Sequence, residues 1–356
     1  MNKLVSIIIP TWNRGYCLKQ SIDSILSQTY KNFEIIIIDD NSTDNTENLI
    51  KSIDDSRIRY FRNESNCGAG KSRNIGVRQA KGELIAFHDS DDIWHNDKLE
   101  KQLSLLEKDQ KLDFVFSWYQ VINNNHITSK IKPSELEKNK VFDCLLAENF
   151  IGTPTMLMKK TVFEKIGGFD ESLKTLEDWE FALRISEKFK VSFVDEVLVD
   201  VIDTKNSVNK AKCLDQFISH FYIFSRFWTA YKEHSSFSIF FINLVNFIYN
   251  CTEQDKQEIL TFVLNNKDSL TFLNALITNY GIYSKNKDSY FDKRIHELTE
   301  YAEELNEEMT SQKLILNEQI ENYKFTVSER DKRIHELSKY AENLTQLLTK
   351  QRTIGK

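Results

Sequence analysis

The sequence predicts an α/β fold whose first two hundred residues form a doubly wound, mostly parallel sheet. Short apolar segments alternate there with segments whose apolar residues recur at helical spacing, which is the pattern of βαβ units. The run Ile35-Ile36-Ile37-Ile38 is apolar at every position, as expected of a central strand covered by helices on both faces. An aromatic-rich segment and then a heptad-like repeat follow. We therefore expect an α-helical subdomain and a C-terminal coiled-coil helix after the sheet.

The strands and helices of the first region are expected where apolar runs and helical faces lie. The expected strands are Leu4–Ile9, Phe33–Ile38, Leu84–Phe87, Asp113–Trp118 and Val191–Val201. Helical faces are formed by Leu18, Ile22, Ile25 and Leu26, by Leu49, Ile50 and Ile53, by Leu99, Leu103 and Leu106, and by Trp179, Ala182, Leu183 and Ile185. The resulting domain is expected to span residues 1–205.

A second region, residues 206–284, has many aromatic residues and almost no glycine or proline. We expect packed helices over residues 212–282, with the aromatic side chains forming their core. Lys and Arg residues flank the aromatic patches, so a peripheral face against a membrane is the alternative interpretation. No stretch reaches the roughly 18 uninterrupted apolar residues of a membrane-spanning helix.

The third region, residues 285–350, contains an internal repeat. Asp292-Lys293-Arg294-Ile295-His296-Glu297-Leu298 returns 39 residues later as Asp331-Lys332-Arg333-Ile334-His335-Glu336-Leu337. Apolar residues keep heptad spacing in both copies, at Ile295, Leu298, Ala302, Leu305 and Met309 and at Ile334, Leu337, Ala341, Leu344 and Leu348. This pattern predicts a coiled coil that joins copies of the chain into a homo-oligomer. A solitary charged helix is the alternative.

Composition excludes several classes of protein. Hydrophobic residues make up 40% of the 356-residue chain and charged residues 28%, as in ordinary globular proteins. The net charge of −6 provides no basic surface for nucleic acid. The five cysteines form no Cys-x-x-Cys pair, which indicates reduced thiols and a cytoplasmic location, extending to the inner face of the membrane if the helical region contacts it. The N-terminus runs directly into a strand, so we expect no export signal.

The clearest chemical signal is the run Asp89-Ser90-Asp91-Asp92, which directly follows the expected strand Leu84–Phe87. Strands of α/β sheets deliver such residues to the carboxyl edge, where ligands bind. Clustered carboxylates repel one another unless a cation or hydrogen-bond donors compensate them. Oxygen ligands suit Mg²⁺ or Mn²⁺, commonly shared with a phosphate. A solvated acidic turn is the alternative for the Asp-x-Asp pair alone.

Three other clusters follow expected strands or precede helices. Pro10-Thr11-Trp12-Asn13-Arg14 comes after the first strand and suits a nucleotide. Asp39-Asp40 follows the isoleucine run, where one carboxylate can accept a hydrogen bond from a nucleobase. In the glycine-rich turn Asn66–Asn74, Lys71 and Arg73 can face a diphosphate, although the spacing is not that of a P-loop. For the stretch after Asp39-Asp40, capping of the next helix is the alternative, which explains Ser42 and Thr43 but not the two aspartates at a strand end.

A last cluster, Gly167-Gly168-Phe169-Asp170-Glu171, precedes Glu177-Asp178 at the start of an expected helix. The helix dipole favours the ionised form of a carboxyl group in the first turn. Asp178 is therefore either a catalytic carboxylate or simply an N-terminal charge for its helix.

Together these stretches resemble glycosyltransferase family 2, whose members have the GT-A fold. The matching stretches are Val5–Arg14, Ile38–Asp44, Gly82–Asp92, and Ile166–Asp170 through Glu177-Asp178, in the family's order over roughly residues 4–200. The resemblance implies an inverting transfer of a sugar from a nucleoside diphosphate donor to an acceptor hydroxyl. It also implies a divalent metal, Mn²⁺ or Mg²⁺, and, by analogy, a glycan or lipid-linked acceptor in cell-surface polysaccharide synthesis.

The resemblance also assigns roles to single residues. Asp39 would bind the nucleobase, Asp89 the ribose and Asp91 the metal, and Asp178 would be the general base. The other candidate donor-binding residues are Pro10, Thr11, Asn13, Arg14, Lys71 and Arg73, with Asp92, Glu177 and His88 as candidate supporting residues. His88 departs from the family pattern, which usually has an apolar residue there. It is either a group that supports the site by hydrogen bonding or an inert substitution.

Other classes of protein fit less well. A nicotinamide dehydrogenase needs Gly-x-Gly-x-x-Gly after the first strand, and Pro10-Thr11-Trp12-Asn13 has no glycine. A nucleotidylyltransferase usually has its glycine-rich basic loop after the first strand, whereas here that loop begins near Gly68. The remaining alternative is a catalytically inactive scaffold that binds a nucleotide sugar and assembles through its coiled coil.

Overall fold

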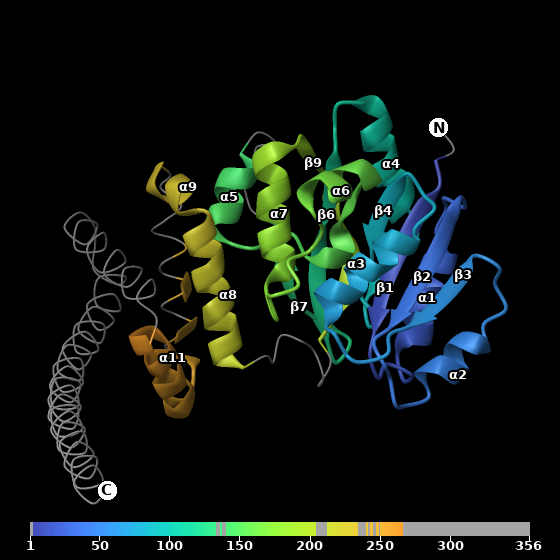
Figure 1. Cartoon of the computed structure of the whole chain (residues 1–356). Coiled ribbons are helices and arrows are strands. Elements are labelled where there is room, and N and C mark those ends of the chain that lie inside the picture. The colour runs from blue at the N-terminus through green and yellow to red at the C-terminus, as the bar shows by residue number, and fades with distance from the viewer. Residues whose placement is uncertain are drawn as a thin grey trace, which may run out of the picture. The chain divides into compact units, whose positions relative to one another are not determined.

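The computed structural model describes residues 3–132, 136, 140–203 and 212–233, and residues 240–265 with gaps. These residues belong to one compact unit, Met1–Phe272, which is built on a nine-stranded sheet (Figure 1). The predicted coiled coil, residues 285–350, lies outside the described residues, as does much of the predicted helical region. Both the coiled coil and the three domain boundaries therefore stay predictions.

The sheet has the strand order β3-β2-β1-β4-β8-β6-β9-β5, and β7 pairs with β6 beside this path. The strands are β1 Val5–Thr11, β2 Phe33–Asp39, β3 Ile58–Arg62, β4 Leu84–Phe87, β5 Ile93–Trp94, β6 Phe114–Asn123, β7 His126–Ile131, β8 Leu157–Lys159 and β9 Val191–Ile202. The expected strands are confirmed as β1, β2, β4, β6 and β9. Because β3, β2, β1 and β4 run parallel, their carboxyl ends lie at one edge.

Helices follow or precede these strands along the chain. They are α1 Leu18–Leu26, α2 Thr46–Lys51, α3 Ala69–Gln79, α4 Lys98–Lys108, α5 Val141–Ala147, α6 Lys160–Ile166, α7 Glu177–Lys188, α8 Cys213–Arg226, α9 Trp228–Glu233 and α11 Glu253–Asn265, with a 3-10 helix at Thr153–Thr155. The helical faces predicted from sequence are confirmed as α1, α4 and α7, and α2 contains Leu49 and Ile50 of the predicted second face but ends before Ile53. Among the described residues, no helix has the length and apolar character needed to cross a membrane.

The core is divided between the two faces of the central strands. On one face, Ile7 and Ile9 of β1 belong to a buried cluster with Ile22 of α1 and Leu99 of α4. On the other face, a Cβ atom added to Gly76 of α3 would meet the Ile8 side chain at 2.3 Å. Alternate residues of one strand therefore pack against different helices, which explains why every position of β1 is buried.

The sheet is mixed, whereas the sequence predicted a mostly parallel one. β8 runs antiparallel to both β4 and β6, β5 runs antiparallel to β9, and β7 runs antiparallel to β6. β8 has three residues and β5 only two. Segments this short show no periodicity by which a strand is recognised, so the antiparallel insertion left no sequence signal.

Candidate active site

The ends of three parallel strands bring the predicted acidic residues to one edge of the sheet. The register places Asp39 at the end of β2 opposite Thr11 of β1, and Phe87 at the end of β4 opposite Ile8. The backbone N–H of His88 then donates to the carbonyl of Ile8 at 3.0 Å. The loops that begin at Pro10–Arg14, Asp39 and Asp89 therefore start side by side.

Asp39 is completely buried, and hydrogen bonds hold both of its carboxylate oxygens. The Ser42 backbone N–H donates to Oδ1 at 2.8 Å, and the Tyr60 hydroxyl donates to Oδ2 at 2.7 Å. The Arg62 guanidinium lies 3.6 Å from the same Oδ2. Burial and the neighbouring Asp39 carboxylate raise the pKa of Tyr60, which keeps this hydroxyl a donor.

Asp40 has a structural function that the sequence did not reveal. Its carboxylate accepts hydrogen bonds from the backbone N–H groups of Cys67 at 2.9 Å and Gly68 at 2.8 Å, and from the Asn63 side chain at 2.8 Å. It therefore fixes the loop that leads into α3. This contact explains the second aspartate of the Asp39-Asp40 pair without a ligand.

The loop after β1 is tied to the loop after β2 through Asn13. Its side-chain oxygen accepts the Thr43 backbone N–H at 2.8 Å, and its own N–H donates to the Ser42 hydroxyl at 2.8 Å. Asn13 has a φ of 53°, a left-handed conformation that asparagine tolerates. Pro10 and Thr11 are the buried last residues of β1. Asn13 therefore shapes the loop, whatever its contact with a donor.

Arg14 lies against the acidic run. Its guanidinium is 3.3 Å from Oδ2 of Asp91, and both side chains are mostly buried, with 12% and 14% exposed. The Arg14 backbone N–H donates to the Thr46 hydroxyl at 3.0 Å, which fixes the base of its side chain. The protein thus supplies one positive charge beside Asp91.

Arg73 joins the acidic run to α7. Its guanidinium donates to Oδ1 of Asp89 at 2.7 Å and to Oε1 of Glu177 at 2.8 Å, and only 5% of its side chain is exposed. Burial opposes its charged form, but Asp89 and Glu177 outweigh that effect and raise the pKa of Arg73. Arg73 is therefore held by carboxylates of the protein from two distant segments.

The sequence predicted a glycine-rich turn around Lys71 and Arg73, and this was wrong. Both residues lie in α3, which begins at Ala69 after Gly68, whose φ is 88°. Lys71 is about half exposed and lies 3.9 Å from the Glu171 carboxylate. Lys71 and Arg73 are two positions apart on a helix and therefore point in different directions.

Asp178 is the second residue of α7, one position after the Glu177 carboxylate that Arg73 binds. Oδ1 of Asp178 accepts the Trp179 backbone N–H at 2.7 Å and the Asn149 side chain at 3.3 Å. Burial and the adjacent Glu177 carboxylate raise the pKa of Asp178 to about 7, against the opposing effect of Arg73. A carboxylate with this pKa accepts protons effectively near neutral pH.

Asp92 and Tyr119 complete the cluster. Asp92 is buried, and its Oδ1 accepts the Ile202 backbone N–H at 3.1 Å. Burial and the charges of Asp89 and Asp91 raise the pKa of Asp92 well above its ordinary value. Burial, Asp178 and Asp92 together raise the pKa of Tyr119. Sequence reasoning missed Tyr119, which directly follows the expected strand Asp113–Trp118 but lies in no cluster of polar residues, and Asn149, which lies in no motif.

His88 is fully buried beneath the acidic run. Its Nε2 lies 2.6 Å from the Ser21 hydroxyl, which also donates to the Asp89 carbonyl at 3.0 Å. The His88 ring packs edge-on against Trp94 at 4.8 Å. Burial and the neighbouring Lys98 lower the pKa of His88 to about 3, so the ring stays neutral. Through Ser21, His88 supports the backbone of Asp89.

The oxygen atoms available at this edge of the sheet can be compared with those that a divalent cation needs. Asp89 and Asp91 offer carboxylate oxygens, which suit Mg²⁺ or Mn²⁺. Among the described residues, no group of three or more His, Cys, Asp or Glu side chains is arranged to hold a metal. Mg²⁺ is commonly bound through one or two carboxylates, with substrate phosphates and water completing its shell. The residues fit a cation that is shared with a diphosphate.

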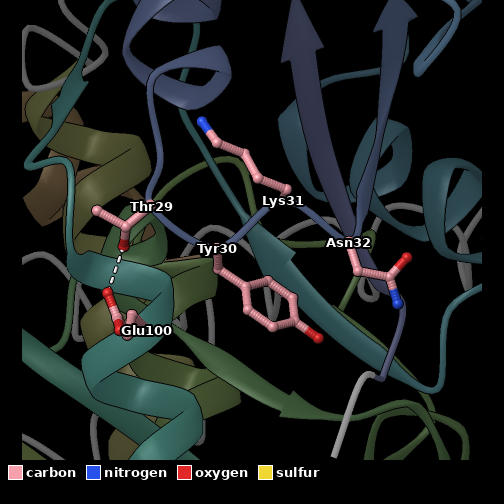
Figure 2. Close-up of a pocket in the computed structure, with 5 residues that line it drawn as sticks. All are labelled: Thr29, Tyr30, Lys31, Asn32 and Glu100. Atoms are coloured by element: carbon pink, nitrogen blue, oxygen red, sulfur yellow. Dashed lines mark hydrogen bonds between the residues drawn. The ribbon is translucent and has the colours of Figure 1, made fainter.

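A surface pocket of about 420 Å³ lies elsewhere, and Figure 2 shows its lining. It is formed by Thr29, Tyr30, Lys31, Asn32 and Glu100, with the Thr29 hydroxyl donating to Glu100 at 2.6 Å. Four of its residues, Thr29 to Asn32, directly precede β2, whereas Asp39 ends that strand. The pocket is therefore at the opposite edge of the sheet from the acidic cluster.

A family model and the relatives found by sequence comparison point to the same family. The family model described as "Glycosyl transferase family 2" matches residues 6–167. An uncharacterized glycosyltransferase of Rickettsia typhi is 34% identical over 235 residues, or 65% of this chain and 72% of that protein. The Escherichia coli UDP-Glc:alpha-D-GlcNAc-diphosphoundecaprenol beta-1,3-glucosyltransferase WfgD is 37% identical over 193 residues, or 54% of this chain and 73% of WfgD.

The fold has a counterpart among solved structures. S. aureus TarS, in a structure with UDP-GlcNAc, matches with a TM-score of 0.55 at 18% identity, covering 86% of this chain and 88% of the TarS chain. At this identity the likeness supports the fold. The mixed α/β sheet is thus shared with a protein whose structure was solved with a nucleotide sugar.

Proposed function

Because this chain belongs to glycosyltransferase family 2 and is a glycosyltransferase, we propose that it transfers a sugar from a nucleoside diphosphate donor to an acceptor hydroxyl with inversion at the anomeric carbon. The single observation that carries the proposal is the arrangement of carboxylates around Arg73. One guanidinium binds Asp89 of the acidic run and Glu177, the neighbour of Asp178. Residues almost ninety positions apart in sequence thus share one site.

In the proposed reaction, Asp178 is the general base. Its carboxylate accepts the proton of the acceptor hydroxyl while the hydroxyl oxygen attacks the anomeric carbon. The bond to the nucleoside diphosphate breaks on the opposite face of the sugar, and the diphosphate leaves with the bonding electrons. The pKa of about 7 gives Asp178 both a substantial ionised fraction and useful basicity at neutral pH.

The donor is proposed to lie across the carboxyl ends of β1, β2 and β4. Asp39 binds the nucleobase, Asp89 the ribose, and Asp91 a divalent cation shared with the diphosphate. Bound there, Mg²⁺ or Mn²⁺ would stabilise the negative charge that grows on the diphosphate oxygens. Pro10, Thr11 and Asn13 shape the nucleotide loop, and Arg14 and Lys71 supply positive charge nearby.

Arg73 takes a role other than direct binding of the diphosphate. It is held by Asp89 and Glu177, so we assign it to keeping these carboxylates apart and oriented. Without its charge, the carboxylates of Asp89, Glu177 and Asp178 would repel one another, and the pKa of Asp178 would rise further.

The acceptor is proposed to be lipid-linked and to belong to cell-surface polysaccharide synthesis. The full name of WfgD states that it acts on a sugar attached to diphosphoundecaprenol, and WfgD is 37% identical to this chain. The reaction would then take place at the cytoplasmic face of the membrane. The aromatic-rich region after residue 212 is a candidate for peripheral contact with that surface.

The direct test is a screen of the purified chain against a panel of nucleotide sugars with Mn²⁺ or Mg²⁺. We expect release of nucleoside diphosphate from one donor class, increased by a matching acceptor and abolished by chelation. The product's anomeric configuration, read by NMR, should be opposite to that of the donor. Retention would overturn the inverting mechanism, and release that is unaffected by a chelator would overturn the metal dependence.

A further inference from the structure

Helix α8 carries a row of polar residues on one face. Asp215, Ser219, Tyr222 and Arg226 are separated by four, three and four positions, which places them on one side of an α-helix. In Figure 1, α8 runs beside α7, the helix that begins with Glu177 and Asp178. We call these four residues the α8 polar row.

The first two residues of the α8 polar row, Asp215 and Ser219, contact the residues directly before α7. The Thr175 and Ser219 hydroxyls are 2.9 Å apart, and both residues are buried. Thr175 also donates to the Asp215 carbonyl at 3.4 Å, and the Lys174 ammonium donates to the Asp215 carboxylate at 3.0 Å. Thr175 is three positions before Asp178, so α8 holds the chain that leads to the base.

The last two residues of the α8 polar row, Tyr222 and Arg226, contact the loop between α6 and α7 and the helix that follows it. The Tyr222 hydroxyl donates to Oδ2 of Asp170 at 2.6 Å. The Arg226 guanidinium is 3.0 Å from Oε1 of Glu180 and 3.7 Å from Asp170. Glu180 is fully buried one turn into α7 and is also bound by Arg184. The loop is thus fixed by α8 both at its start and at the helix that follows it.

The loop needs such support because its own backbone is strained. Leu176 has a φ of 58°, which disfavours a residue with a bulky side chain, and no side-chain hydrogen bond caps the start of α7. A strained residue persists only where its surroundings determine its conformation. At this position the surroundings include Thr175 and its contact with Ser219.

We propose that α8 is a positioning element for the reaction, acting through Thr175 to hold Asp178 in its catalytic place. This inference rests on the proposed role of Asp178 as the base. It assigns a function to a helix that lies beyond the residues matched by the family model, which end at 167. Displacement of a catalytic group by about 1 Å can cost on the order of a hundredfold in rate.

The test compares hydroxyl deletions on either side of the contact. Thr175→Val and Ser219→Ala should each lower kcat about tenfold or more while the donor KM stays within about twofold of wild type. Thr175→Ser keeps the hydroxyl and should restore most of kcat. Ser186→Ala is the matched control, because Ser186 lies on α7 and its hydroxyl donates to the Leu183 carbonyl within that helix, away from the contact with α8.

A second readout does not need activity. Hydrogen–deuterium exchange, followed by mass spectrometry, should be faster over residues 170–178 in Thr175→Val and Tyr222→Phe than in wild type. Tyr30→Phe, which removes a hydroxyl bonded to the Lys3 carbonyl, should leave this segment unchanged. Wild-type kcat and exchange in the loop variants would overturn the role of α8. An inactive wild-type chain would instead overturn the proposed function, while the exchange experiment still tests the contact.

Discussion

Two buried carboxyl groups, Asp92 and Asp178, lie in surroundings that raise their pKa values for the same reasons. Each is removed from water, and each has further carboxylates nearby. Arg73 limits the effect at both positions, because its positive charge lowers both pKa values. Asp178, with a pKa raised to about 7, changes its protonation state near neutral pH.

This pKa predicts the pH dependence of turnover. Below about pH 7 the Asp178 carboxyl group is protonated and cannot accept the acceptor's proton, so kcat should fall with decreasing pH. The decline should approach tenfold per pH unit below about pH 6, and kcat should level off above about pH 8. Initial rates at saturating donor and acceptor, measured across this pH range, give the acidic limb of the pH–kcat profile. A limb near pH 4, the range of an ordinary aspartate, would contradict the perturbed environment.

The lowered pKa of His88 predicts that the free energy of unfolding depends on pH. Its pKa is lowered to about 3 in the folded chain, whereas an unfolded histidine has a pKa near 6.5. The unfolded state therefore binds the proton first, and stability is lost as the pH falls below about 6.5. From pH 7.5 to 5.5 this single group should cost about 1.4 kcal/mol of unfolding free energy.

His88→Leu removes this titration and supplies the control. Between pH 7.5 and 5.5, urea denaturation should show the wild type losing about 1.4 kcal/mol more than His88→Leu. An exposed histidine, His126, serves for comparison, and His126→Gln should follow the wild type. Parallel losses in the wild type and His88→Leu would show that His88 is protonated normally in the fold.

At the scale of elements, the loop Gly167–Leu176 is held by hydrogen bonds from three helices. Asn74 of α3 accepts the Phe169 backbone N–H at 2.9 Å, Arg184 of α7 donates to the Gly168 carbonyl at 2.7 Å, and Tyr222 of α8 binds Asp170. The same loop leads directly to Asp178. The packing of these helices therefore determines where the proposed base lies.

Adjacent glycines of this loop give a matched pair of substitutions. Gly167 and Gly168 have φ values of 86° and 74°, so alanine at either costs about 1–2 kcal/mol of backbone strain. A Cβ at Gly168 would also lie 2.6 Å from Oδ1 of Asn74, whereas one at Gly167 would meet nothing within 4 Å. Gly168→Ala should therefore be the more destabilising in thermal or urea unfolding. Equal losses would mean that Asn74 moves aside freely.

Much of the central sheet was predictable from sequence, and the reason is visible in particular strands. The run Ile35–Ile38 has the pattern of a buried parallel strand, and parallel strands bring their carboxyl ends together. This argument places Asp39 and the acidic run Asp89–Asp92 at one edge of the sheet from the sequence alone. The same argument does not separate the role of Asp40 from that of Asp39, because the role of Asp40 depends on where the folded chain places Cys67 and Gly68.

Helix α3 shows why other parts were not predictable. Gly68 and Gly70 indicated a turn there, because glycine has low helix propensity, and Gly76 is a further glycine within the helix. In the structure, Gly76 allows α3 to approach Ile8 of β1 so closely that no side chain would fit. Tertiary packing therefore outweighs local preference. Arg73 was consequently assigned to the diphosphate, whereas it binds Asp89 and Glu177.

At the scale of the whole molecule, the repeat over residues 285–350 predicts self-association. A chain ending near Ser284 should show a smaller mass by light scattering than the full chain, because the heptad seam of both copies is removed. Linking active sites in this way would raise their effective concentration along a polymeric or membrane-bound acceptor. Identical assembly states for the two chains would remove the coiled coil as the cause of assembly.

The proposed reaction is tested most directly at Asp178, the residue on which it depends. Asp178→Asn preserves the size of the side chain and its acceptance of the Trp179 N–H, but it removes the base. With the donor found in the screen, kcat should fall by about 10²–10⁴-fold. The donor dissociation constant, measured by calorimetry on the same preparation, should stay within about twofold of wild type. Wild-type turnover in Asp178→Asn would contradict the assignment of Asp178 as the general base.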